Sequence, residues 1–189
     1  MTRDAASFDR LYREDPDPWD YETSAYEADK YLRCLDLLPR KQYRDALDVG
    51  CSTGMFTSFI AARCEHLVGL DFAPTALSRA RQRCIPNACF LYANIPRDWP
   101  RGVWDLIIVS EVLYYLEPND LRLVADLIAA SLAPKGVCLI VGYTGSTDTV
   151  LSAQGVESYL LKRLALAFPL HNLRRDNSSM WVAAGFERY

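Results

Sequence analysis

From residue 46 onward, short apolar runs alternate with segments whose apolar residues recur at helical spacing. The runs have the length of strands that are buried on both faces of a sheet. The predicted strands cover residues 46–49, 67–70, 89–93, 104–109 and 137–142, and the predicted helices cover 55–63, 74–84, 119–132 and 155–167. This alternation predicts an α/β fold with a doubly wound, mostly parallel sheet whose crossovers are right-handed.

The two ends of the chain follow other patterns. Residues 1–21 predict irregular or short helical structure, and a helix capped at 23–24 is predicted to run to about Leu38. Residues 171–189 predict two strands around a turn at 176–179. These two strands would complete a seven-stranded sheet with an antiparallel edge.

The length and hydropathy of the chain limit its organisation. With 189 residues it is most simply one domain, 1–189, in which residues 1–40 form an N-terminal helical cap and residues 41–189 form a Rossmann-like core. No apolar run approaches the roughly 20 residues that a membrane-spanning helix needs, and no apolar segment typical of a signal peptide follows the first residues. We therefore expect a cytoplasmic protein without a membrane partner.

Charge and cysteine usage narrow the range of ligands. The net charge is −3 and no basic stripe exists, so a nucleic-acid partner is not expected. Residues 14–22 hold five acids and no base, either as a solvated segment or as a rim that attracts a cationic ligand. The six cysteines form no CxxC pair, and the only histidines are His66 and His171, so neither a metal site nor a disulfide framework is expected.

The first predicted strand runs directly into a turn of small residues, Asp48-Val49-Gly50-Cys51-Ser52-Thr53-Gly54. A strand, a glycine turn and a helix N-terminus together form a nucleotide-type ligand site. The carboxylate of Asp48 would repel a pyrophosphate but would suit an amino group. The turn also lacks the GxGxxG spacing of NAD-binding proteins, because no glycine occurs at 55–60. These features favour S-adenosylmethionine (SAM) over NAD.

Further candidate residues follow other predicted strands and should meet this turn at the carboxyl edge of the sheet. Asp71 would accept both ribose hydroxyls of the ligand, with Phe72 beside it. Asn94 would read the adenine amino group, and Ile95 would pack on the ring. Glu111-Val112 follows the fourth predicted strand, and a carboxylate after such an apolar run is not expected to serve packing.

These motifs resemble the successive motifs of class I SAM-dependent methyltransferases. The N-terminal string from Asp17 to Glu27, together with the segment from Ser110 to Leu116, resembles more particularly the family of the nodulation methyltransferase NodS. The resemblance covers roughly residues 15–143. It implies N-methylation of a free amino group, in NodS that of a partly deacetylated chito-oligosaccharide, with SAM as cofactor and S-adenosylhomocysteine (SAH) as product. It also implies that Lys30 pairs with the methionine carboxylate of SAM.

Two departures from the family pattern bear on the site. The middle glycine of the usual turn is Ser52 here, a small residue that should still allow close approach if its φ is negative, and we expect binding to survive it. The segment 142–148 is unlike the corresponding NodS stretch. Since such loops usually touch the acceptor, the sugar substrate does not follow from the resemblance.

The remaining candidate roles concern the sulfonium and the acceptor. Trp19 and Tyr26 would close over the cofactor, because aromatic faces stabilise a nearby cation. Asp48 would take the methionine amino group within the turn. Glu111 is the candidate to bind or deprotonate an amine, with orientation of SAM or of the backbone as the alternative role.

Three tyrosines are candidates for the acceptor pocket. We expect one of Tyr114 and Tyr115 to pack inward and the other to line the pocket, with Tyr115 as a second catalytic candidate. Tyr143, after the fifth strand, has the same status as a pocket residue.

The resulting prediction is a methyltransferase for a small-molecule acceptor, most simply an amine, that uses SAM without a metal and is a monomer or homodimer. Three alternatives stay open. They are a small-molecule O-methyltransferase, a non-catalytic SAM-binding module and an NAD-dependent oxidoreductase.

Overall fold

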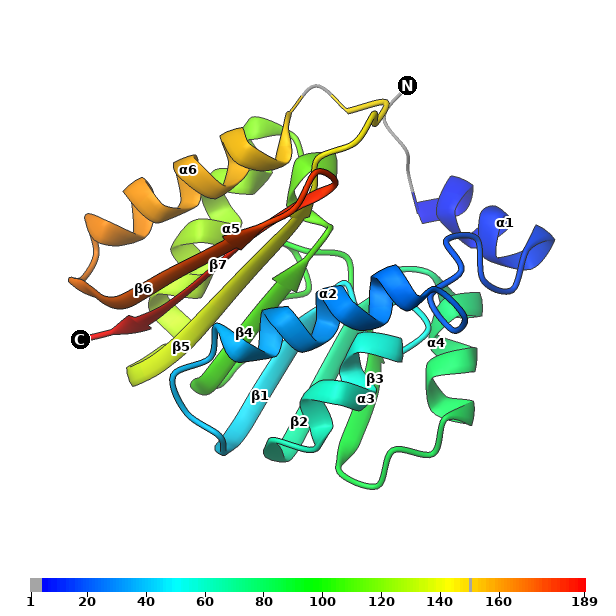
Figure 1. Cartoon of the computed structure of the whole chain (residues 1–189), viewed down its shortest axis with the longest axis horizontal. Helices are drawn as coiled ribbons and strands as arrows, with labels where there is room; N and C mark the ends of the chain where they lie inside the picture. Colours follow the sequence, from blue (N-terminus) through cyan, green and yellow to red (C-terminus); the bar gives the residue numbers. More distant parts are fainter. Residues whose placement is uncertain (1–4, 150) are drawn as a thin grey trace.

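Seven strands form one sheet in the order β3-β2-β1-β4-β5-β7-β6, as the computed structural model shows (Figure 1). Strands β1 to β5 are parallel, and β7 pairs antiparallel with both β5 and β6. The structure describes residues 5–149 and 151–189. The strands are β1 (Tyr43–Val49), β2 (Cys64–Asp71), β3 (Ala88–Tyr92), β4 (Trp104–Ser110), β5 (Leu132–Tyr143), β6 (Leu170–Asn177) and β7 (Trp181–Arg188). The predicted mostly parallel, seven-stranded α/β fold is confirmed.

Helices cover both faces of this sheet (Figure 1). The helices are α1 (Ala5–Glu14), α2 (Ala25–Asp36), α3 (Met55–Ala61), α4 (Pro74–Gln82), α5 (Pro118–Ser131) and α6 (Ala153–Ala165), with a 3-10 turn η1 (Leu113–Tyr115). Alternate residues of each strand enter two separate cores, because successive strand side chains point to opposite faces. Leu47 and Ile107 lie in the core beneath α5 and α6, whereas Ala46 and Ile108 lie in the core beneath α2 and α3.

Helix α1 extends over the carboxyl edge of the sheet and packs against α4. Asp9 of α1 accepts a hydrogen bond from the backbone N–H of Thr75, at 2.8 Å, in the first turn of α4. This carboxylate satisfies one of the unpaired N–H groups at the start of that helix. Of the irregular or short helical structure predicted for residues 1–21, the helical form is found over Ala5–Glu14, with a defined docking site on α4.

Helix α2 lies across β1 and is fixed at both ends (Figure 1). Ser24 caps its N-terminus by accepting from the N–H of Glu27. Arg33 donates to Asp176 of β6 at 2.5 and 2.8 Å, and its guanidinium lies 4.8 Å from the centre of a Trp181 ring. The last hairpin of the sheet thus holds the helix that carries Lys30.

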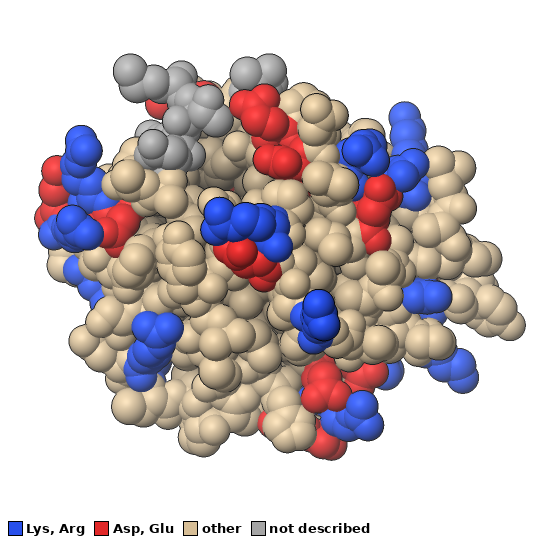
Figure 2. Space-filling view, turned by 180° about the vertical axis from the view of Figure 1, so that it is seen from behind, with Lys and Arg blue, Asp and Glu red and all other residues tan. Residues whose placement is uncertain are grey.

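Charged side chains on the face seen in Figure 2 occur singly or in groups of mixed sign rather than as a patch of one sign. All six cysteines are free thiols, four of them buried. Among the described residues, no helix is long and apolar enough to cross a membrane.

Candidate active site

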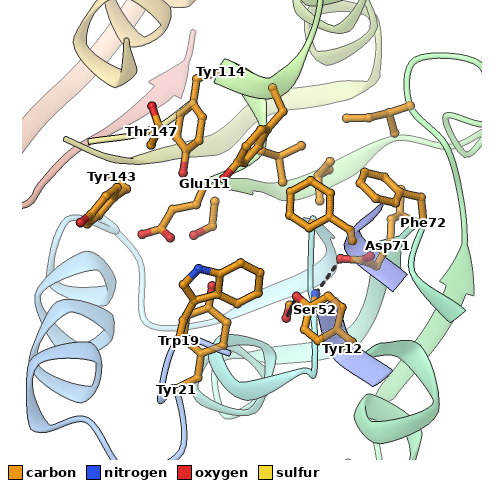
Figure 3. A pocket seen from close by; sticks show the side chains of 18 of the residues that line it. Tyr12, Trp19, Tyr21, Ser52, Asp71, Phe72, Glu111, Tyr114, Tyr143 and Thr147 are labelled. Carbon is orange, nitrogen blue, oxygen red and sulfur yellow. Dashed lines mark hydrogen bonds between the residues drawn. The ribbon is translucent and has the colours of Figure 1, made fainter. Parts of the chain in front are cut away.

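A cavity of about 430 Å³ opens at the carboxyl edge of the sheet (Figure 3). Helix α1, the segment before α2, and the turns after β1 to β5 all contribute to its wall. Eleven of the residues predicted for the site line this cavity: Trp19, Gly50, Ser52, Asp71, Phe72, Ile95, Glu111, Val112, Tyr114, Tyr115 and Tyr143. The topology therefore brings residues together that lie more than 100 positions apart in sequence.

Gly50 and Gly54, the two glycines of the turn after β1, are required for different steric reasons. Gly50 adopts φ +81°, and a Cβ there would lie 1.9 Å from Cγ2 of Val112, so only glycine fits. Gly54 also has a positive φ, +77°, but a Cβ there would meet Ala80 of α4 at 3.1 Å. Gly54 lies at the packing contact between the start of α3 and α4, and it does not line the cavity.

Ser52 adopts a left-handed backbone with φ +51°. We expected a serine to be tolerated here if its φ were negative. The φ of Ser52 is positive instead. The serine instead keeps the glycine-like conformation, which costs an L-residue about 1–2 kcal/mol. Its hydroxyl shares a hydrogen bond with the hydroxyl of Tyr12 on α1, a contact that glycine would lack.

Asp71 closes β2 and points into the cavity at the end opposite Glu111 (Figure 3). Its Oδ2 accepts from the N–H of Ser52 at 2.9 Å, and its Oδ1 accepts from the N–H of Ala73 at 2.8 Å. Each carboxylate oxygen keeps a further lone pair for a ligand hydroxyl. Burial raises the pKa of Asp71 to about 6, despite these hydrogen bonds.

Asp48 is buried at the end of β1 and does not reach the large cavity. Its Oδ2 accepts from the hydroxyl of Thr57 on α3 at 2.6 Å, and burial raises its pKa to about 6. Asp48 lines a second, smaller cavity of about 40 Å³, together with Lys30 and Cys51. This small cavity adjoins the large one, since residues including Tyr21, Gly50 and Glu111 line both.

Lys30 stands between two carboxylates in the interior. Its Nζ lies 2.6 Å from Oε1 of Glu111 and 2.6 Å from Oε2 of Glu27, and its side chain is only 2% exposed. Burial lowers the pKa of Lys30, but the two carboxylates outweigh this effect and raise it above the ordinary value, so the side chain stays charged at neutral pH. Glu111 itself has a left-handed φ of 56°, a conformation that is uncommon outside glycine and concentrates at functional sites.

Aromatic rings from the N-terminal segment form one wall of the large cavity. Trp19 stacks on Tyr21 with ring centres 5.6 Å apart, and it meets Tyr12 edge-on at 5.5 Å. Phe8 meets Tyr115 edge-on at 5.1 Å. Phe8, Tyr12 and Tyr21 also line the cavity and were not predicted as site residues, although the repetition of aromatic residues in this charged segment was a visible signal.

Other candidates lie elsewhere than expected. Tyr26 is 40% exposed and Asn94 is also exposed, and neither lines either cavity. Of the adjacent tyrosines, Tyr114 is buried and Tyr115 is half-buried, but both line the large cavity. Tyr114 packs in the core, as expected for one of these two tyrosines, and it reaches the cavity wall as well.

A family model for nodulation protein S, NodS, matches residues 6–154. The chain belongs to the NodS family. Nodulation protein S of Sinorhizobium fredii is 35% identical over 124 residues, which are 64% of this chain but only 57% of that protein. Nodulation protein S of Bradyrhizobium diazoefficiens is 31% identical over 150 residues, 72% of each chain. The resemblance to NodS predicted from the motifs is thus confirmed.

Solved structures of methyltransferases share the fold of this chain. The N-methyltransferase NodS from Bradyrhizobium japonicum in complex with SAH shares the fold, with a TM-score of 0.80 over 97% of this chain and 98% of that chain, at 22% identity. A proposed methyltransferase from Pseudomonas syringae is 32% identical, with a TM-score of 0.75 over 87% of this chain and 100% of that chain. The fold is that of class I SAM-dependent methyltransferases.

Proposed function

We propose that this member of the NodS family transfers a methyl group from SAM to the amino group of a small molecule. The observation that carries the proposal is the position of Glu111. Its carboxylate is held by Lys30 at the junction of the two cavities, next to the turn and facing the large cavity. A base at this position would lie between a cofactor bound along the turn and an acceptor in the large cavity.

The chemistry of the donor set fits SAM. Asp71, with lone pairs left over and apolar Phe72 and Ile95 nearby on the cavity wall, suits the adenosine end. The small cavity offers the ammonium of Lys30 and the carboxylate of Asp48, which suit the methionine carboxylate and amino group. When bound, SAM supplies an electrophilic methyl group on a positively charged sulfur.

The chain itself must position the acceptor and remove a proton. An ammonium nitrogen has no lone pair, so an amine acceptor has to lose one proton before it can react. Lys30 contacts Oε1 of Glu111, and the carboxylate can take that proton on its second oxygen. General bases contribute about 10²–10⁴-fold to such steps, and positioning contributes about 7–11 kcal/mol.

The acceptor class follows from the site and from the family together. NodS is named an N-methyltransferase in its solved structure, which supports an amine here. An amino sugar or chito-oligosaccharide is one member of that class. The loop after β5, which departs from NodS, contributes Ser146, Thr147 and Asp148 to the cavity wall and would select among amines.

We also propose that the protein acts in the cytoplasm as a monomer or homodimer, without a metal or a nucleic-acid partner. The composition and the absence of a basic stripe support these proposals. Within the described residues, no group of three or more potential ligands is arranged to hold a metal ion.

Labelled SAM and a panel of amino sugars, polyamines and phenols test the proposal. Label should appear on an amine and not on hydroxyls. Glu111→Gln should lower turnover on that amine by about 10²–10⁴-fold, while the SAM dissociation constant changes less than about threefold. Glu117→Gln, an exposed acid six residues further on, is the matched control and should behave as the wild type.

The other outcomes point to specific alternatives. Label on hydroxyls alone would indicate an O-methyltransferase. Tight SAM binding without transfer to any acceptor would indicate a non-catalytic module, and binding of NADH without SAM would indicate an oxidoreductase. Full turnover by Glu111→Gln would remove Glu111 as the base.

A further inference from the structure

Three charged side chains in the interior face two different cavities. Lys30 lines only the small cavity, Glu27 lines only the large one, and Glu111 lines both. Because one lysine compensates two carboxylates, the trio carries a net charge of about −1 when all three groups are ionised. The uncompensated charge therefore lies toward the large cavity, on the side away from Lys30.

The carboxylate of Glu27 keeps lone pairs beyond those used by its contacts with Lys30 and Tyr31. Its Oε2 is buried and lies 2.6 Å from Nζ of Lys30, in an ion pair whose lysine is shared with Glu111. The residue is only 8% exposed. A buried carboxylate that shares its counter-charge with a second carboxylate would be stabilised by a further cationic donor.

The rest of the large cavity has the same sign of charge. Its described wall contains four acidic residues, Glu27, Asp71, Glu111 and Asp148, and no lysine or arginine. SAM bears one net positive charge and would offset part of this field. A cationic acceptor would offset a further part of it, beside the buried Glu27 and Glu111.

We propose that Glu27 is a second carboxylate of the acceptor site and that it binds the ammonium form of the acceptor together with Glu111. This inference rests on the proposed function and adds to it a residue and a charge state of the substrate. Glu27 is a specificity residue in this role, since it holds the ammonium group while Glu111 receives the proton. Neutral hydroxyl compounds of the same shape would leave both carboxylates uncompensated.

The surroundings of the trio suit a cation as well. Tyr21 and Tyr114 line the large cavity beside Glu111, and Tyr31 bonds to Glu27 from the next turn of α2. Aromatic faces add roughly 0.5–2 kcal/mol to the binding of a nearby cation. An ammonium group in this corner would thus meet carboxylates and ring faces, with no competing positive side chain on the described cavity wall.

The inference can be tested without knowing the natural acceptor. The test compares the dissociation constants of small amines with those of hydroxyl compounds of similar shape. The pairs are benzylamine and benzyl alcohol, glucosamine and glucose, and ethanolamine and ethylene glycol, each titrated into the full chain at neutral pH with saturating SAH. The wild type should bind the amine of at least one pair about tenfold more tightly than its hydroxyl counterpart. Glu27→Gln should reduce that ratio to less than about threefold while leaving SAH affinity unchanged.

Asp29→Asn is the matched control, because Asp29 lies on the same helix with a side chain that is 67% exposed. This variant should keep the wild-type ratio. Glu27→Asp, which retains the charge, should keep most of the preference and serves if Glu27→Gln does not fold. A wild type that shows no preference for any amine, or a Glu27→Gln variant that keeps the full preference, would overturn the inference. Failure to bind SAH would instead overturn the proposed function, and the amine preference would then be measured without it.

Discussion

Tyr12 on the first helix shares a hydrogen bond with Ser52 in the turn after β1, so the helix that covers the cavity is fastened to the turn beneath it. Glycine, the usual residue of this turn, has no hydroxyl for such a bond. The left-handed serine therefore combines the backbone shape of glycine with a side-chain contact to α1. This contact forms part of the wall of the large cavity, because Tyr12 and Ser52 both line it.

The first prediction concerns this contact. Tyr12→Phe and Ser52→Ala should each weaken the docking of α1 by about 0.5–1.5 kcal/mol, and the double variant should lose no more than the larger single loss. Amide hydrogen exchange of residues 5–14 measures the effect, with faster exchange expected in all three variants. Ser58→Ala, whose hydroxyl bonds within α3, is the control. Strictly additive losses would show that the two hydroxyls are not coupled.

The second prediction concerns Asp71. Asp71→Ala should weaken SAM or SAH binding by roughly 2–4 kcal/mol, because the carboxylate would hold both ribose hydroxyls and also holds the N–H of Ser52. Isothermal titration calorimetry measures the change. Asp98→Asn is the control, because Asp98 is an acid that follows β3 and pairs with Arg97. This variant should bind SAM or SAH as tightly as the wild type does. Unchanged affinity in Asp71→Ala would mean that the ribose binds elsewhere.

The third prediction concerns the pH dependence of stability through Asp48. Its pKa is about 6 in the folded protein against 3.8 in the unfolded chain, so the folded state binds a proton more readily between these values. This group therefore makes the ligand-free protein less stable as the pH rises from about 4 to 6. The Asp48→Asn variant cannot lose stability in this way. The free energy of unfolding of the variant minus that of the wild type should therefore increase by up to about 3 kcal/mol between pH 4 and pH 6.

Urea unfolding of the ligand-free protein at several pH values checks the Asp48 prediction. Asp45→Asn, on the same strand, is a control of opposite sign, because Arg44 holds the pKa of Asp45 below its ordinary value. That variant should become less stable relative to wild type as the pH rises. A pH-independent difference for Asp48→Asn would contradict the assignment of a raised pKa.

The fourth prediction concerns Lys30. Lys30→Met should destabilise the protein by about 3–5 kcal/mol at neutral pH, since it leaves Glu27 and Glu111 buried without their counter-charge. The loss should shrink as the pH falls, because burial raises the pKa of Glu27 and its carboxylate can then take up a proton. Thermal and urea unfolding measure the change. Adding Glu27→Gln to Lys30→Met should restore part of the stability, whereas a further loss would show that the charges do not interact.

Much of the core and of the cofactor turn was predictable because local signals decide them. Uninterrupted apolar runs predicted β1 and β4, and the acids that follow strands predicted that Asp71 and Glu111 would meet at one edge. Parallel strands align their carboxyl ends, so no knowledge of side-chain packing was needed for this step.

The parts that the sequence did not reveal depend on tertiary contacts. The docking of α1 rests on Asp9 reaching Thr75, 66 residues away. Glu27 lies three residues after Ser24, which is the spacing of a capping box. Its carboxylate pairs with Lys30 instead, because a buried ammonium group is costly without a counter-charge. The exposure of Tyr26 and Asn94 likewise follows from how α2 and the loop after β3 are placed.

The bond between Arg33 and Asp176 has a consequence for biosynthesis. The helix that carries Glu27 and Lys30 leaves the ribosome early, but its anchor lies 143 residues further along. A nascent chain can therefore build its first βα units while α2 still lacks its partner in the final hairpin. Helix α2 therefore gains this anchor only after translation has passed the hairpin, so the last strands of the chain secure a helix made near its start.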